Sequence, residues 1–304
     1  MKPARNPDSA MRHAAVAIVR ELRNAGHEAC FAGGCVRDLL RNVAPKDYDI
    51  ATSARPEAIR ALYPKANAIG AHFGVMLVRR AGFSFEIATF REDGDYHDGR
   101  RPTSVTFSDA AADAKRRDFS INGMFFDPLE NRVIDYVGGR NDLAAKRIRA
   151  IGCAADRFRE DYLRLLRAVR FATVLEFEIE PETWEAIRAA AGRIPAISPE
   201  RIREELDKIW LSPHRLRGFD QLVESGLMEA ILPEILALRG CEQAPQFHPE
   251  GDVFVHTRLM LAQLAPEASL SLVLSVLFHD IAKPKTFSMD PADGRIRFHG
   301  HETL

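Results

Sequence analysis

The sequence lacks any arrangement of cysteines that would bind zinc or form a disulfide framework. Its 304 residues include only four cysteines, at positions 30, 35, 153 and 241, and no two of them form a CxxC pair. Cysteines this few and this scattered are typical of proteins in a reducing compartment. We therefore expect a cytoplasmic protein rather than a secreted one.

Long apolar runs and an excess of one charge are also lacking. No segment approaches the about 20 apolar residues of a membrane helix, and residues 10–24, interrupted by charges, predict an amphipathic helix rather than a signal peptide. We expect no membrane partner. The 42 basic and 43 acidic residues nearly cancel. Basic residues nevertheless cluster at 100–101, 115–117 and 157–170, and a local basic surface can bind phosphates without a basic total.

The pattern of short elements changes near residue 150. Before it, strand-like runs at 27–31, 48–51, 73–80 and 83–90 alternate with helix-like runs, and Ala81-Gly82 is a hairpin signal. After it, residues 158–173, 181–191, 199–210, 213–225 and 270–281 have helical periodicity. We predict an α+β fold: a small mixed sheet followed by an all-α remainder.

A glycine pair and an acidic pair carry the strongest chemical signal. Gly33 and Gly34 let the backbone approach a phosphate, and Arg37 stands one turn into the helix that follows. Asp47 and Asp49, two apart in a strand, project from one face and repel each other unless a cation lies between them. The combination predicts a Mg²⁺ site that handles a triphosphate.

Phosphoryl transfer with two metal ions usually requires a third carboxylate. Glu86 lies in the middle of the predicted strand Phe85-Glu86-Ile87-Ala88-Thr89, among apolar neighbours. We take Glu86 as the candidate.

Five segments together resemble a known family. GGCVRDLL, PKDYDIAT, FEIATFR, KRRDFSINGMFFDP and FREDYLRLLRAVRF follow one another in this order. They resemble the head and neck of the class II CCA tRNA nucleotidyltransferases and the bacterial poly(A) polymerases, over roughly residues 27–240. The resemblance implies a polymerase-β-type nucleotidyltransferase head at 27–155 and a helical neck that binds RNA and nucleotide at 156–245.

The resemblance also implies an activity, a metal and substrates. It implies template-independent addition of CMP and AMP, from CTP and ATP, to the tRNA 3′ end with Mg²⁺. It assigns catalytic metal binding to Asp47 and Asp49, and nucleotide binding to Gly33, Gly34 and Arg37. It places residues 115–122 on the nucleotide and sugar side of the pocket, with these candidates: Arg116, Arg117, Asp118 and Asn122. The alternative for Arg116-Arg117-Asp118 is a solvated turn with salt bridges.

An aspartate and an arginine in the neck are candidates for choosing the base. Asp161 and Arg164 stand at i, i+3 in a segment whose apolar stripe predicts an amphipathic helix. An acceptor beside a donor matches the edges of C and A but not those of U and G. In the family such a pair acts as a protein template, and Arg167 and Arg170 would contact phosphates or lock the pair. The alternative is a surface salt bridge of little consequence.

Two further segments separate members of the family. The polar stretch 91–106 corresponds to a loop that is needed for A addition, and its apparent completeness argues against an enzyme that adds only C. Residues 70–75 (GAHFGV) lack the basic pair of the poly(A) polymerases and resemble the tRNA-directed branch.

Histidines gather near the end of the sequence. His256, the pair His279-Asp280, and the later His299 and His301 resemble the start of an HD-type metal phosphohydrolase site. We expect an HD-like helical domain at 246–304 with a transition metal at His256, His279 and Asp280, or alternatively scattered surface histidines. The late Asp ligand is missing, which indicates a truncated or incomplete domain.

Three alternatives stay open beside CCA addition. They are an enzyme that adds only A or a poly(A) polymerase, an HD-type phosphohydrolase, and a non-catalytic RNA-binding module with a decayed head.

Overall fold

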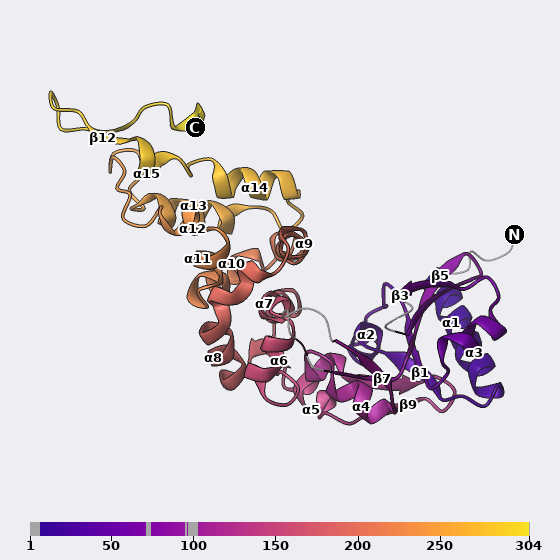
Figure 1. Cartoon of the computed structure of the whole chain (residues 1–304). Coiled ribbons are helices and arrows are strands. Elements are labelled where there is room, and N and C mark those ends of the chain that lie inside the picture. The colour runs from indigo at the N-terminus through magenta and orange to yellow at the C-terminus, as the bar shows by residue number, and fades with distance from the viewer. Residues whose placement is uncertain (1–6, 71–73, 95, 97–102, 304) are drawn as a thin grey trace, which may run out of the picture. The chain divides into compact units, whose positions relative to one another are not determined.

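The computed structural model describes residues 7–70, 74–94, 96 and 103–303 (Figure 1). The chain divides into two compact units, Met1–Glu160 and Asp161–Leu304. The first contains all strands of the main sheet, and the second is mainly helical. This confirms the predicted α+β class. No helix among the described residues is long and apolar enough to cross a membrane.

A mixed seven-stranded sheet forms the centre of the first unit. Its order is β3-β4-β5-β2-β1-β8-β9, and β2 runs parallel to β5 whereas the other recorded pairs are antiparallel. The strands are β1 (Ala29–Ala32), β2 (Asp49–Thr52), β3 (Asn67–Gly70), β4 (Val75–Arg80), β5 (Phe83–Thr89), β8 (Met124–Asp127) and β9 (Arg132–Asp135).

Both faces of this sheet are covered by a core. Alternate residues of a strand point to opposite faces and therefore belong to different cores. Ala29 and Phe31 of β1 belong to a core shared with the first helices, whereas Cys30 and Ala32 belong to a second core shared with α4. The helices of the unit are α1 (Pro7–Asn24), α2 (Gly34–Leu40), α3 (Pro56–Leu62), α4 (Ala110–Lys115), α5 (Gly139–Ala144) and α6 (Ala154–Glu160). Shorter elements are β6 (Arg91–Asp93), β7 (Val105–Phe107), β10 (Arg147–Ile148) and the 3₁₀ helix η2 (Ser120–Asn122).

The predicted hairpin between β4 and β5 is present. Arg80 pairs with Phe83, and the two residues between them, Ala81 and Gly82, have φ of 52° and 85°. Two positive φ values match the type I′ turn, whose twist suits a two-residue hairpin.

The second unit packs its helices around α7. Leu165, Leu166, Ala168 and Val169 of α7 are fully buried, and α7 contacts α9 and α10. The helices are α7 (Leu163–Leu175), α8 (Pro181–Ala190), α9 (Pro199–Trp210), α10 (Arg215–Glu224), α11 (Leu227–Ile231), α12 (Pro233–Leu236), α13 (Val253–Gln263), α14 (Leu270–Phe278) and α15 (Lys283–Thr286). Shorter elements are β11 (Glu178–Ile179), β12 (Phe287–Met289), β13 (Ile296–Phe298), η3 (Ala191–Ala196) and η4 (His301–Thr303).

The single helix expected at 158–173 is wrong, because the chain forms two helices there. Helix α6 ends at Glu160 and α7 begins at Leu163. The Asp161 carboxylate accepts a hydrogen bond from the Leu163 N–H at 3.0 Å, the Asx-turn bond that aspartates form with the backbone two residues on. Asp161 therefore precedes α7 and does not share a helix with Arg164. The two compact units meet after Glu160, at the end of α6, whereas the boundary expected between residues 155 and 156 falls within α6.

Candidate functional site

Asp49 of β2 and Glu86 of β5 lie side by side on two central strands of the sheet, and Asp47, just before β2, is close enough for its charge to act on Asp49. Strands β2 and β5 are parallel, with Ile50 beside Ile87. Asp49 and Glu86 each precede one of these paired residues, so their side chains project from the same face. Glu86 is exposed rather than enclosed by its apolar neighbours.

The charges of these carboxylates act on one another. Burial, followed by the negative charges of Asp47 and Glu86, raises the pKa of Asp49 to about 6, and the Arg117 guanidinium opposes this rise. A carboxyl group that resists ionisation next to two others is poised to bind a cation. The donor set consists of oxygens, which suits Mg²⁺.

The turn between β1 and α2 brings the backbone close to this cluster. Gly33 has φ 71°, and a Cβ atom there would lie 3.3 Å from Arg117 Nη1 and 3.6 Å from Asp49 Oδ2. Any side chain at this position would be strained and crowded. The Gly33 backbone is therefore adjacent to both the acidic cluster and an arginine.

A chain of hydrogen bonds connects α2 with η2. Arg37 Nη1 donates to Asn122 Oδ1 at 2.8 Å, and Asn122 Nδ2 donates to Asp118 Oδ1 at 3.3 Å. Asp118 Oδ1 also accepts the Phe119 N–H at 2.7 Å. Asp118 and Asn122 are each only 7% exposed. Of the alternative considered for Arg116-Arg117-Asp118, the solvation of Asp118 is wrong, whereas both arginines do form salt bridges.

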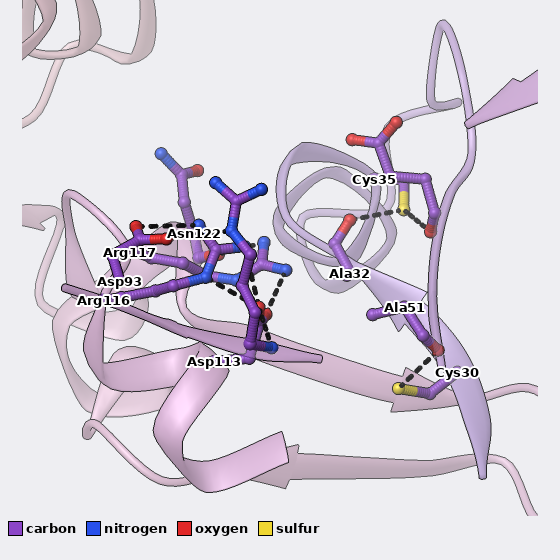
Figure 2. A network of polar contacts seen from close by, with 11 residues as sticks. Cys30, Ala32, Cys35, Ala51, Asp93, Asp113, Arg116, Arg117 and Asn122 are labelled. Carbon is purple, nitrogen blue, oxygen red and sulfur yellow. Dashed lines mark hydrogen bonds and ion pairs between the residues drawn. The ribbon is translucent and has the colours of Figure 1, made fainter. Parts of the chain in front are cut away.

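The two neighbouring arginines share one buried aspartate (Figure 2). Arg117 donates to Asp113 Oδ2 from Nε at 3.2 Å and from Nη2 at 2.9 Å, and Arg116 Nη2 lies 2.7 Å from Asp113 Oδ1. Arg116 also contacts Asp93 Oδ2 at 3.5 Å and lines a cavity of about 610 Å³ beside α4 and α6. Arg117 alone of the two reaches Gly33. Sequence reasoning missed Asp113, although its i, i+3 and i+4 spacing to the arginines was a signal.

The two cysteines of this region are core residues. Figure 2 shows Cys30 and Cys35 directed at backbone carbonyls, with Sγ donating to Ala51 O at 3.8 Å and to Ala32 O at 3.2 Å. Burial raises the pKa of the Cys35 thiol to about 12. These thiols are thus not nucleophiles.

In the second unit, Asp161 and Arg164 lie on either side of the start of α7. Arg201 of α9 donates from Nη2 to Asp161 Oδ2 at 2.7 Å, and the Arg164 N–H donates to the Asp161 carbonyl at 3.0 Å. Arg164 is 9% exposed. Helix α9 therefore anchors Asp161, a contact that sequence reasoning did not include.

The other two arginines of α7 share an aromatic neighbour. The guanidinium carbons of Arg167 and Arg170 lie 5.4 and 3.8 Å from the Phe171 ring centroid. Arg170 also forms an ion pair with Glu205, which is 4% exposed. The charge of Arg170 is thus compensated within the helical unit.

The histidines near the end of the sequence do form a cluster. One ligand atom from each of His256, His279 and Asp280 lies within 4.8 Å of the others, and His248, Glu250 and His256 form a second group with the same spacing. Burial alone would raise the pKa of Asp280, but hydrogen bonds from His279 and Lys283 outweigh it and lower the pKa to about 2. His301 Nε2 lies 3.7 Å from Asp280 Oδ1. Sequence reasoning missed His248 and Glu250, which stand close before His256.

Two expected features fall partly outside the described residues. The stretch 91–106 begins and ends in the paired strands β6 and β7, with Asp93 opposite Val105, but residues 95 and 97–102 lie outside the described part. In the segment 70–75, residues 71–73 also lie outside the described part.

Comparison with known families assigns both parts of the chain. Residues 29–149 match the poly A polymerase head domain. Residues 176–238 match the probable RNA and SrmB-binding site of polymerase A.

Individual relatives agree with this assignment. The chain is 42% identical over 238 residues to a CCA-adding enzyme of Lactobacillus johnsonii, covering 78% of this chain and 58% of that protein. It is 43% identical over 220 residues to that of Geobacillus stearothermophilus, covering 72% and 54%. The chain thus spans little more than half the length of these relatives.

A solved structure shares the fold. The crystal structure of the Bacillus stearothermophilus CCA-adding enzyme in complex with CTP matches 93% of this chain and 65% of its own, with a TM-score of 0.74 and 34% identity. Sequence, fold and the grouped motifs therefore agree: the chain belongs to the family of CCA-adding tRNA nucleotidyltransferases and bacterial poly(A) polymerases.

Proposed function

We propose that this chain is the nucleotidyl-transferring part of a CCA-adding enzyme, which adds CMP and AMP from CTP and ATP to the 3′ end of tRNA without a nucleic-acid template. The observation that carries this proposal is the grouping of Asp47, Asp49 and Glu86 beside the Gly33 turn and Arg117. We place the reaction in the cytoplasm, where the four free cysteines would stay reduced.

The three carboxylates would hold Mg²⁺. Burial and then the charges of Asp47 and Glu86 raise the pKa of Asp49, and a divalent cation would relieve the repulsion between these carboxylates. When bound, magnesium supplies charge neutralisation at the triphosphate and activates the attacking hydroxyl. Arg37 and Arg117 would bind the phosphates, and Gly33 and Gly34 leave room for them. Asp118 and Asn122, linked to Arg37, would orient the sugar.

The base would be chosen by Asp161 and Arg164. C and A both present an exocyclic amine, which donates to a carboxylate, beside a ring nitrogen, which accepts from a guanidinium. U and G present a carbonyl in place of the amine, which would leave the carboxylate unpaired. The bond from Arg201 would hold Asp161 in position for this choice.

The relatives support this choice of substrates. Two curated proteins that match over most of this chain are CCA-adding enzymes, and the solved structure with 34% identity is a complex with CTP. A poly(A) polymerase or an enzyme that adds only A would differ in its product rather than in the carboxylate cluster.

One assay separates these activities. Purified protein with Mg²⁺ receives CTP, ATP, UTP or GTP, singly or as CTP with ATP, and tRNAs that end at the discriminator base, at C or at CC. We expect CMP to be added to the first two tRNAs, AMP to the third, and growth to stop at CCA. Addition of A alone, or a long A tail, would replace the proposal with one of the alternatives. No addition to any tRNA would favour the non-catalytic module.

A second activity is favoured by the histidine cluster. His256, His279 and Asp280 would hold a transition metal, since their ligand atoms already lie within 4.8 Å of one another. We propose a metal-dependent phosphohydrolase activity for this HD-like region, separate from nucleotide addition.

A further inference from the structure

Asp113 occupies a position that the proposed mechanism does not use. It lies in α4 with Ala110 and Ala114 on the buried side of the helix, and it is 1% exposed. Burial would raise the pKa of this carboxyl, but Arg117 and Arg116 outweigh the effect and lower it. A buried, ionised carboxylate beside a candidate phosphate-binding arginine requires an explanation.

The contacts of Asp113 fix the direction of Arg117. The Nε and Nη2 atoms of Arg117 both donate to Asp113 Oδ2. Arg117 Nη1 is thereby left to reach the Asn122 carbonyl at 3.4 Å and the Gly33 turn, and the guanidinium lies over the Phe125 ring. Two donors of one guanidinium that converge on the same carboxylate oxygen restrict its orientation more than a single hydrogen bond would.

The same carboxylate is connected to the start of the polar stretch 91–106. Asp113 Oδ1 accepts from the Arg91 N–H at 3.4 Å and pairs with Arg116, which also contacts Asp93. Asp93 in turn pairs with Arg91 Nε at 2.9 Å. Strand β6 and the nucleotide side of the pocket are therefore joined through one buried residue.

We infer that Asp113 is a positioning residue that aims Arg117 at the triphosphate and makes this aim depend on the placement of β6. This inference rests on the proposed function, in which Arg117 binds the incoming nucleotide. Of the two arginines that contact Asp113 through their side chains, Arg117 is the one that lies beside Gly33 and acts electrostatically on Asp49.

The test compares Asp113→Asn with a matched control. Asparagine keeps the size of the side chain but removes the charge and one acceptor. Because small displacements of a binding group are costly, we expect kcat/KM for CTP and ATP to fall about 10- to 100-fold, mostly through KM. The control is Asp127→Asn, which removes an equally buried carboxylate paired with Arg23 at 2.6 Å in the same unit. It should lower stability and leave KM unchanged.

A double-mutant cycle distinguishes positioning from general structural support. If Asp113 acts through Arg117, then Asp113→Asn should change KM little when Arg117 is already alanine. Asp93→Asn weakens the ion pairs with Arg91 and Arg116 but leaves the bonds between Asp113 and Arg117 in place. It should therefore raise KM by a smaller factor than Asp113→Asn. Equal KM effects of Asp113→Asn in the presence and absence of Arg117 would overturn the inference.

Equilibrium binding keeps this test independent of the proposed reaction. Titration of the parent and Asp113→Asn with CTP and Mg²⁺ should give a weaker affinity for the variant, whether or not tRNA is extended. Unchanged affinity would overturn the inference, whereas an inactive parent that binds CTP would overturn only the proposed function. If Asp113→Asn does not fold, Asp113→Glu is titrated in its place. It keeps the charge but shifts the carboxylate, and the same criteria apply.

Discussion

Replacing Asp49 with asparagine should abolish nucleotide addition and yet stabilise the metal-free protein. The raised pKa means that the folded state disfavours the ionised form of Asp49. Asparagine has nearly the same shape and no charge, so it removes the repulsion from Asp47 and Glu86 while the strand β2 stays packed. A residue that stabilises the fold by its packing would show the opposite response.

The expected gain in the free energy of unfolding follows from the pKa of Asp49 in the unfolded and folded states. This pKa rises from 3.8 in the unfolded chain to about 6 in the folded one, and each pKa unit corresponds to about 1.4 kcal/mol. The folded state therefore binds the proton more tightly, so stability is present below pH 4 and is lost as the pH rises through 6. Above pH 7 the loss reaches about 3 kcal/mol, and Asp49→Asn should recover up to that amount. For a unit of this size, each kcal/mol shifts Tm by about 2–4 °C.

Thermal or urea unfolding in EDTA at several pH values measures this difference. The variant should exceed the parent at pH 7.5, and the two should coincide near pH 4. Mg²⁺ should stabilise the parent more than the variant, because it binds the folded carboxylates. Asp135→Asn is the control, because the pKa of Asp135 is shifted in the opposite direction from that of Asp49. Burial would raise the pKa of Asp135, but backbone N–H groups, beginning with that of Arg140, outweigh it and lower the pKa. Its loss should destabilise the protein above pH 4. An Asp49→Asn variant that is less stable than the parent at pH 7.5 without metal would refute the reasoning.

Three further predictions concern selectivity, the second site and the glycine turn. Asp161→Ala and Arg164→Ala should each let UTP compete with ATP on a CC-ended tRNA. The ratio of kcat/KM for ATP to that for UTP should fall by about one to two decades for each lost base contact. An unchanged ratio would contradict the base-reading role. His279→Ala should remove Ni²⁺ or Mn²⁺ binding, measured by calorimetry, and any phosphodiesterase activity, with nucleotide addition intact, whereas a parent that binds neither metal would contradict the second site. Gly33→Ala should lower the free energy of unfolding by about 1–3 kcal/mol, because φ 71° is strained for alanine, and should reduce addition by crowding Arg117; wild-type stability and activity would contradict this.

Local signals in the sequence placed several elements correctly. Helical periodicity at 181–191 and 199–210 marked α8 and α9, and Ala81-Gly82 marked the hairpin. These signals work because capping, turn conformation and the alternation of apolar residues depend on neighbours in the chain.

The segment around Asp161 shows where local pattern fails. Residues 158–173 have a continuous helical periodicity, yet the chain interrupts the helix at Asp161 and Tyr162. The Asp161 side chain accepts from the backbone of Leu163 and from Arg201 of α9. Arg201 is 40 positions away in the sequence, so no window of local pattern could include this competitor.

The sequence by itself determined the chemical groups of this protein: two carboxylates two residues apart, a glycine pair before a helix, and an arginine pair. The expectation that both carboxylates belong to one strand is wrong, because β2 begins only at Asp49. Only the tertiary structure decided which of these groups meet. The parallel pairing of β2 with β5 sets Glu86 beside Asp49, and the buried Asp113 directs Arg117 toward Gly33 and Arg116 toward Asp93. Strand register and buried ion pairs depend on packing between distant segments, because their free energy comes from desolvation and contact that exist only in the folded state.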